Sequence, residues 1–217
     1  MIEQNDMDAR ETLVEAYREV VARGLTDQAS GNLSCRAPGG MLISCSGASA
    51  ETLTPDLVVK VLEDGSWTGD VKPSSEWRMH QAIYERHEDA NAVVHTHSDY
   101  CVAMACNNLP LPGFHYMVGM FGGKDVPCVP YSTFGTEELA GDVADALTDR
   151  AACLLGNHGM ICYGTDFDEA IAHAERLENL CRHYVLAKTL GEPDLLTDEQ
   201  WDEFFDQSRK LDYRELT

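Results

Sequence analysis

Apolar residues recur at helical or strand-like spacing along most of the chain. Between residues 8 and 23, Leu13, Tyr17 and Val20 fall on one helical face, and Gly24 follows as a helix stop. The same patterns predict further helices over 72–87, 99–108, 136–149, 166–190 and 195–217, and strands over 30–47, 56–63, 91–98 and 151–164. Helices and strands therefore alternate, which favours one mixed α/β domain over residues 1–217. The Gly-, Pro- and aromatic-rich stretch 109–136 is predicted to be a long loop, of the kind that is usually functional or wraps a neighbour.

Charge and composition exclude several classes of protein. The 217 residues carry 16 Lys+Arg and 37 Asp+Glu, and the net charge of −21 argues against a nucleic-acid binder or a protein of anionic membranes. No stretch approaches about 18 consecutive apolar residues, and the N-terminal residues do not resemble a secretory signal. The eight cysteines are scattered and include no CxxC pair. We expect a cytoplasmic protein with reduced thiols and no transmembrane helix.

Three histidines stand out as candidate metal ligands. His95 and His97 lie two residues apart in a strand-like run, so their imidazoles share one face of a sheet. Two neighbouring imidazoles repel if both are charged, and a divalent metal resolves this conflict. The pair alone fits ordinary structural histidines as well as a metal site. His158, at the turn between two apolar strands, favours the metal site, because three imidazoles leave a tetrahedral metal one open position. We expect Gly159 to let the backbone turn sharply behind His158.

The start of the helix at 72–87 has two interpretations. Glu76 follows Ser74 and Ser75, where a carboxylate complements the helix dipole and serines cap a helix. Hydroxyls and free backbone N–H groups at such a terminus also bind phosphate without a basic patch, and the Ser46–Gly47 loop offers further donors. Spacing alone does not decide between them. The histidines at 80, 87, 173 and 183 lie on predicted helices, where we expect structural or surface roles.

Several separated stretches together resemble the class II aldolase/adducin family. They are SGNLSCR with MLISCSG, KPSSEWRMHQAIYERHEDANAVVHTHS, HYM, VPCVPYSTFGT and LLGNHGMICYG, which occur in family order and span most of residues 10–190. The resemblance implies a three-layer αβα fold around a central, mainly antiparallel sheet. It also implies a fourfold homotetramer with active sites between subunits.

The resemblance also implies roles for individual residues. A Zn²⁺ ion, with Mn²⁺ or Co²⁺ as alternatives, is expected on His95, His97 and His158 with Glu76 beside it as acid/base, a task that requires a pKa raised towards neutrality. Tyr116 of a neighbouring subunit and Tyr213 near the C-terminus are expected to assist proton transfer. The expected phosphate-binding residues are Asn32, Ser46, Gly47, Ser74 and Ser75.

The implied reaction is reversible aldol cleavage of a ketose 1-phosphate such as fuculose 1-phosphate or a related deoxy-sugar phosphate. The products are dihydroxyacetone phosphate and a short aldehyde such as L-lactaldehyde. Pentulose-phosphate 4-epimerases of the family carry an acidic catalytic residue where this chain has Met117, which makes that activity a weaker alternative. Methylthioribulose-phosphate dehydratases and sugar-acid phosphate decarboxylases use the same scaffold and remain alternatives. A non-catalytic adducin-like scaffold is more remote, because this chain retains all three histidines and Glu76.

Overall fold

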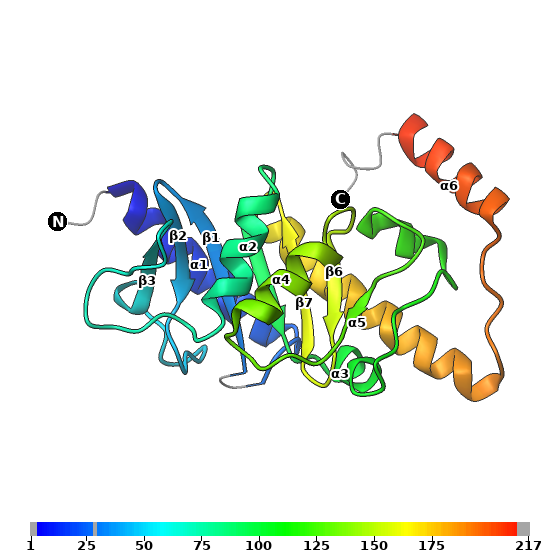
Figure 1. Ribbon diagram of the computed structural model, residues 1–217, viewed down its shortest axis with the longest axis horizontal. Coiled ribbons are helices and arrows are strands. Elements are labelled where there is room, and N and C mark those ends of the chain that lie inside the picture. The colour runs from blue at the N-terminus through cyan, green and yellow to red at the C-terminus, as the bar shows by residue number, and fades with distance from the viewer. Residues whose placement is uncertain (1–3, 28–29, 212–217) are drawn as a thin grey trace.

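A seven-stranded, mainly antiparallel sheet forms the centre of the molecule (Figure 1). The structure is a computed structural model that describes residues 4–27 and 30–211. The strand order is β3-β2-β1-β4-β7-β6-β5, and every neighbouring pair is antiparallel except β5 and β6. The strands are β1 Gly31–Ala37, β2 Gly40–Ser44, β3 Val58–Leu62, β4 Ala92–Thr96, β5 Cys128–Val129, β6 Ala152–Leu155 and β7 Gly159–Gly164.

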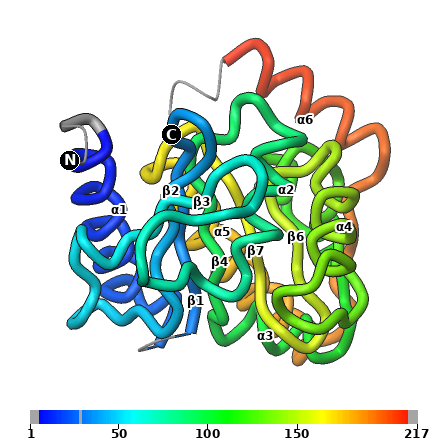
Figure 2. The backbone as a smooth tube through the Cα atoms, turned by 60° about the vertical axis from the view of Figure 1, so that its left-hand side comes forward, coloured from blue at the N-terminus to red at the C-terminus, as the bar shows by residue number. Residues whose placement is uncertain are grey.

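Helices cover both faces of the sheet and complete the three layers (Figures 1 and 2). Helices α1, α3 and α5 pack on one face, whereas α2 and α4 pack together on the other. The α-helices are α1 Gln4–Ala22, α2 Trp77–Arg86, α3 Asp99–Ala105, α4 Glu137–Ala146, α5 Phe167–Leu190 and α6 Asp198–Lys210. Two 3₁₀ helices, η1 Pro55–Leu57 and η2 Tyr116–Phe121, lie between them. The predicted αβα architecture with a mainly antiparallel sheet is confirmed.

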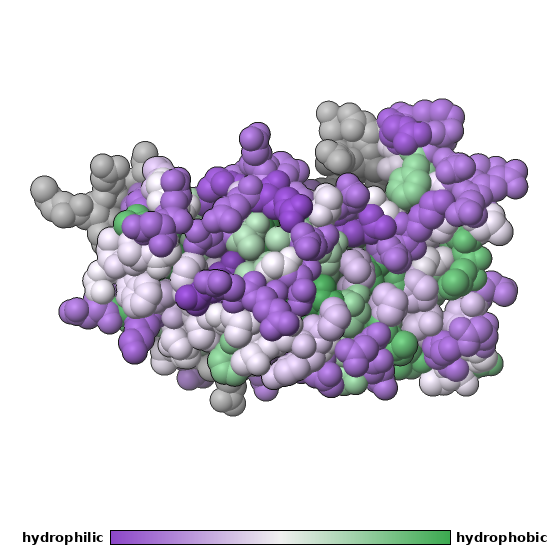
Figure 3. Space-filling view, viewed as in Figure 1, coloured by the Kyte–Doolittle hydropathy of each residue, from purple (hydrophilic) through white to green (hydrophobic). Residues whose placement is uncertain are grey.

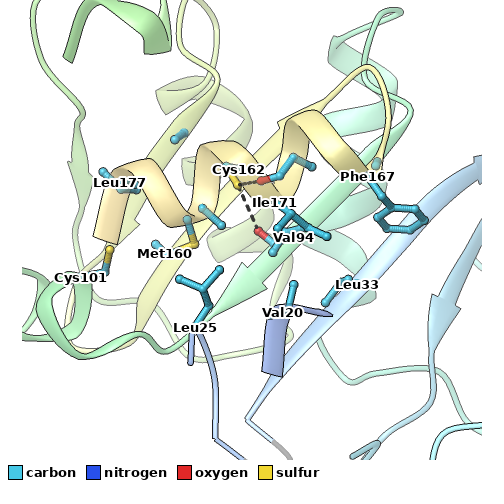
Figure 4. Packing of buried hydrophobic residues seen from close by; sticks show 14 of the residues in the cluster. Val20, Leu25, Leu33, Val94, Cys101, Met160, Cys162, Phe167, Ile171 and Leu177 are labelled. Carbon is cyan, nitrogen blue, oxygen red and sulfur yellow. Dashed lines mark hydrogen bonds between the residues drawn. The ribbon is translucent and has the colours of Figure 1, made fainter. Parts of the chain in front are cut away.

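The alternation of side chains along each strand divides the core in two. On β4, Val94 packs into the cluster beneath α1, α3 and α5, whereas Val93 packs beneath α2 and α4. Figure 4 shows the first cluster, in which Val94 and Met160 of the sheet lie close to Ile171 of α5. Because both faces of the central strands are buried, β4 is an unbroken run of buried residues. A polar side chain on this strand therefore enters a dry environment.

Three predicted elements differ from the structure. Helix α2 begins at Trp77 rather than at residue 72, because the backbone N–H of Ser74 bonds to the carbonyl of Ser44 and keeps the preceding residues extended beside β2. The strand predicted at 56–63 divides into η1 and β3. The loop predicted at 109–136 contains η2 and the short strand β5.

The surface shown in Figure 3 is mostly hydrophilic, as the excess of acidic residues leads one to expect. Within residues 4–27 and 30–211, none of the helices combines the length and the apolar character needed to cross a bilayer.

Candidate metal centre and its surroundings

Three imidazoles meet at one end of β4, on the face covered by α2 and α4. His95 lies on β4 opposite Asn32 of β1 and Ile161 of β7, and His97 follows the strand on the same side. His158 reaches them from the turn between β6 and β7. The ring centroids of the three histidines are each 4.9 Å apart. The pairing of β4 with β7 thus brings together residues more than 60 positions apart in the chain.

The turn that carries His158 depends on a different residue from the one predicted. Asn157 has the left-handed conformation, with φ 55°, whereas Gly159 is not in that region. A Cβ atom at Gly159 would lie 2.4 Å from the carbonyl oxygen of Thr96 and 2.8 Å from Cδ2 of His97. Glycine is therefore required at 159 by close approach to β4 rather than by the turn itself.

Glu76 completes the cluster from the residue before α2. Its Oε2 lies 3.2 Å from Nε2 of His95, and its Oε1 lies 3.1 Å from Nε2 of His158. The Nε2 atoms of His95 and His97 are 3.0 Å apart. One ligand atom from each of the four residues lies within 4.8 Å of the other three.

The donor set fits a divalent metal ion. Nδ1 of His95 lies 2.8 Å from the carbonyl oxygen of Met160, which only accepts, so Nδ1 carries the proton and Nε2 presents a lone pair to the cluster. Glu76 Oε1 is buried, and apart from Nε2 of His158 at 3.1 Å it has no partner among the described residues. Converging imidazole lone pairs around a buried carboxylate are costly without a cation. We therefore describe these four residues as a candidate site for a metal of the Zn²⁺ class.

The electrostatics of the cluster bear on the protonation of Glu76 and His97. Burial raises the pKa of Glu76, but the facing imidazoles of His95 and His158 outweigh burial and hold it below its ordinary value. Glu76 is therefore expected to be ionised in the protein without metal, and a pKa raised towards neutrality in the complete site stays a prediction. Burial and the neighbouring imidazoles lower the pKa of His97 from 6.5 to about 4, which keeps its ring neutral and able to bind a metal.

The residues expected to bind phosphate lie on two adjoining loops and on β1. The backbone N–H of Ser46 bonds to the carbonyl of Lys72 at 3.1 Å, so the loop with exposed Ser46 and Gly47 lies beside the segment with Ser74 and Ser75. This segment leads directly into Glu76 at the metal cluster. Ser74 Oγ also accepts a hydrogen bond from the backbone N–H of Glu76 at 3.3 Å, so this serine supports the start of α2, whereas the side chain of Glu76 makes no capping hydrogen bond. The two serine-bearing loops therefore adjoin each other next to the cluster, and phosphate binding by them stays a prediction.

Asn32 was expected to contact phosphate, but its side chain has other partners. Its amide nitrogen donates to Glu76 Oε2 at 2.9 Å, and its amide oxygen lies 2.5 Å from Nε2 of His80. His80 is fully buried and was assigned only a structural or surface role from the sequence. Its position four residues after Glu76, on one face of α2, is the sequence signal that would have linked it to the site.

Of the two tyrosines expected at the site, only Tyr116 lies within the described residues, and it is not part of the cluster in this single chain. Tyr116 is the first residue of η2 and is about half exposed. Its ring stacks on that of His115 and lies near the ring of Phe204 of α6. Tyr213 lies outside the described residues. A contribution of Tyr116 to proton transfer therefore requires a neighbouring copy, as the fourfold assembly implies, and stays a prediction.

Comparison with known proteins places the chain in a family. The profile of the family described as Class II Aldolase and Adducin N-terminal domain matches residues 11–185. This protein belongs to that family, and the aldolases among its relatives identify it as an enzyme of the class II aldolase type.

Two relatives and one solved structure illustrate the likeness. The chain is 42% identical to the 5-methylthioribulose-1-phosphate/5-deoxyribulose-1-phosphate aldolase of Rhodospirillum rubrum over 88% of this chain and 86% of the relative. It is 39% identical to the L-fuculose phosphate aldolase of Escherichia coli, over 87% of this chain and 88% of that protein. A solved L-fuculose 1-phosphate aldolase superposes with a TM-score of 0.89 at 33% identity, covering 96% of this chain and 98% of the other. The family and the fold are thereby confirmed.

Proposed function

We propose that this protein is a metal-dependent aldolase that reversibly cleaves a deoxyketose 1-phosphate to dihydroxyacetone phosphate and a short aldehyde. The observation that carries the proposal is the cluster of Glu76 with three histidines directly beside two hydroxyl-bearing loops. The relatives named above act, by their names, on fuculose, methylthioribulose or deoxyribulose phosphates. Their substrates share a phosphate at one end and an apolar group at the other, so this chemistry defines the substrate class.

The reaction needs a proton removed at one substrate atom and returned at another. The C4 hydroxyl loses its proton, the C3–C4 bond breaks to leave an aldehyde at C4, and C3 takes up a proton to give dihydroxyacetone phosphate. A bound Zn²⁺, or Mn²⁺ or Co²⁺, supplies Lewis acidity that stabilises negative charge on the substrate oxygens as the bond breaks.

The chain's own residues bind the phosphate and move the protons. Glu76, held at the cluster, moves the proton at C3. Tyr116 from a neighbouring copy assists at the C4 hydroxyl. The hydroxyls and backbone N–H groups of Ser46, Gly47, Ser74 and Ser75 hold the phosphate, which the net charge of −21 would otherwise repel.

The direct test is release of dihydroxyacetone phosphate from a panel of ketose 1-phosphates, each with and without a chelator. The panel contains fuculose, rhamnulose, ribulose, 5-deoxyribulose and methylthioribulose phosphates. We expect chelator-sensitive release, fastest from a deoxy or methylthio substrate. Ribulose 1-phosphate is the matched control for 5-deoxyribulose 1-phosphate, because the two differ by a single hydroxyl.

The alternatives predict other products from the same panel. A metal-loaded protein that releases no dihydroxyacetone phosphate but loses water, or inverts C4 of a pentulose phosphate, is a dehydratase or an epimerase. Evolution of carbon dioxide from a phosphorylated sugar acid indicates a decarboxylase. Either result would overturn the aldolase proposal while leaving the family unchanged.

Assembly is part of the proposal, because the described part of one chain brings no tyrosine to its cluster. We propose a homotetramer whose active sites lie between subunits. Sedimentation at micromolar concentration should give about four times the mass of one chain. Mixing inactive Tyr116→Phe and Glu76→Gln proteins should restore part of the activity, because a mixed interface contains one intact site.

A further inference from the structure

A chain of buried side chains leads from the interior of α2 to the carboxylate of Glu76. Tyr84 Oη lies 2.8 Å from Ser34 Oγ, which lies 2.7 Å from Nδ1 of His80. Nε2 of His80 lies 2.5 Å from Oδ1 of Asn32, and Nδ2 of Asn32 lies 2.9 Å from Glu76 Oε2. All five residues are buried, and Ser34 and His80 are completely inaccessible to solvent.

Two regular elements place these residues in line. Asn32 and Ser34 are two positions apart on β1, so they share the face of the sheet beneath α2. Glu76, His80 and Tyr84 are spaced by four along the start and body of α2, so they follow one another on a single helical face. The strand and the helix thus supply alternate members of the chain.

The direction of every hydrogen bond follows from its two ends. The carboxylate of Glu76 only accepts, so the amide nitrogen of Asn32 donates to it and the amide oxygen faces His80. Nε2 of His80 must then carry the proton, which leaves Nδ1 of a neutral ring to accept from the Ser34 hydroxyl. The oxygen of Ser34 in turn accepts from the Tyr84 hydroxyl. All four donors therefore point towards Glu76.

The protonation states required by this direction agree with the surroundings. Burial, reinforced by the imidazole of His95, lowers the pKa of His80 from 6.5 to about 3, so the ring is neutral. Burial raises the pKa of Tyr84 well above its ordinary value, so the phenol keeps its proton.

We propose that His80, acting through Asn32, is a positioning residue that holds the Glu76 carboxylate in place for the metal and for proton transfer. The proposal rests on the function proposed above for the Glu76 cluster. A carboxylate free to rotate would lose part of its metal affinity, and hydrogen-bonded partners behind metal ligands typically contribute 10- to 100-fold. His80 does so by fixing the orientation of the Asn32 amide. Without a donor at position 80, the amide oxygen of Asn32 loses its partner, and only the bond to Glu76 itself still orients the amide.

The test measures metal affinity, which needs no substrate. Zn²⁺ is titrated against a chromophoric chelator, and Co²⁺ absorption spectra report the ligand geometry. We expect His80→Leu to weaken Zn²⁺ binding by about 10- to 100-fold and to alter the Co²⁺ spectrum. His80→Gln can still donate from its amide nitrogen to Asn32 and should recover most of the affinity. His173→Leu is the matched control, because His173 is also a buried histidine, lies on the opposite face of the sheet, and bonds only to the carbonyl of Tyr163 in the described contacts.

A double-mutant cycle distinguishes positioning from a general effect on folding. In a Glu76→Ala background, His80→Leu should have no further effect on Zn²⁺ affinity, because the group that it positions is gone. Equal losses with and without Glu76, or equal losses in His80→Leu and His173→Leu, would overturn the proposal. If His80→Leu does not fold, Ser34→Ala takes its place in the cycle, since it removes the donor to His80 Nδ1.

The result of this double-mutant cycle does not depend on which substrate the enzyme uses, because the cycle measures metal affinity alone. Coupling between His80 and Glu76 in metal binding, together with no cleavage of any ketose phosphate, would support the positioning role and reject the aldolase proposal. Cleavage of a ketose phosphate without such coupling would support the aldolase proposal and reject the positioning role of His80. In an active protein, His80→Leu should lower kcat more than it raises KM, and His80→Gln should recover most of the lost kcat.

Discussion

The two faces of the central sheet satisfy their buried polar side chains in different ways. On the face covered by α1 and α5, the buried side chains of Tyr17 and His173 bond to the backbone. The hydroxyl of Tyr17 donates to the carbonyl of Ala48 at 2.8 Å, and Nδ1 of His173 lies 2.8 Å from the carbonyl of Tyr163. On the face covered by α2, buried side chains bond to one another, from Tyr84 to Glu76.

The difference separates buried polar side chains that stabilise the fold from those that orient a residue of the candidate site. A carbonyl partner is present in any sequence that adopts the fold, and most side-chain hydrogen bonds in proteins are to backbone or water. A linked series of side chains requires each member to be chosen together with its neighbours, and its value is lost if one link fails. Such a series is retained where the group at its end must be held in one orientation, and here that group is the carboxylate of the candidate metal centre.

The largest effect should come from removing one imidazole of the cluster. We expect His95→Ala to reduce bound metal from about one ion per chain to almost none, because the remaining ligands no longer surround the ion. Elemental analysis of the purified variant measures this directly. Metal content near zero in the unsubstituted protein as well would instead favour a non-catalytic, adducin-like scaffold.

Glu76→Gln should separate metal binding from proton transfer. The amide retains an oxygen for the metal but cannot accept the substrate proton, so we expect metal to be retained and turnover to fall by about 10²- to 10⁴-fold. Single-turnover rates at matched metal occupancy provide the measurement. A near-normal cleavage rate would show that another residue is the acid/base.

The stability of the metal-free protein should fall in acid, and His80 should contribute. Its pKa is 6.5 when unfolded and about 3 when folded. Between these values the unfolded chain binds the proton and the folded chain does not, so the free energy of unfolding decreases as pH falls. The contribution approaches about 1.4 kcal/mol per pH unit. Urea unfolding at pH 6.5 and pH 5 should show a smaller decrease for His80→Gln, and equal decreases would contradict the assignment of a buried, neutral ring.

The smallest effects should distinguish the two faces most directly. Tyr17→Phe and Ser34→Ala each remove one buried hydroxyl, and we expect each to cost about 1 kcal/mol of stability. Only Ser34→Ala should also weaken Zn²⁺ binding, because its hydroxyl donates to Nδ1 of His80 and so holds the ring in the orientation that donates to Asn32. Chemical denaturation and the chelator titration together make the comparison, and an equal effect of both variants on metal affinity would remove the distinction between the faces.

Much of the architecture could be predicted from the pattern of the sequence. Alternating helices and strands, together with the family resemblance, predicted the three layers, and the HxH spacing placed His95 and His97 on one side of a strand. Local errors arose where tertiary contacts overrode local preference. The Pro73–Ser74–Ser75 segment suits a helix start, but pairing with the end of β2 keeps it extended and moves the start of α2 to Trp77.

The sequence by itself determined the residue types and their local periodicity, because side-chain direction along a strand or helix follows from backbone geometry alone. It therefore determined that His95 and His97 share a face and that Glu76, His80 and Tyr84 follow one line along α2. The tertiary structure decided which of these faces meet. The strand order brought His158 to His95. The packing of α2 on β1 joined the two polar residues of β1, which are two positions apart, to the polar residues spaced by four along α2, and so formed a single buried chain of hydrogen bonds that ends at Glu76. Hydrogen bonds between residues more than 40 positions apart depend on how elements pack, which no local pattern encodes.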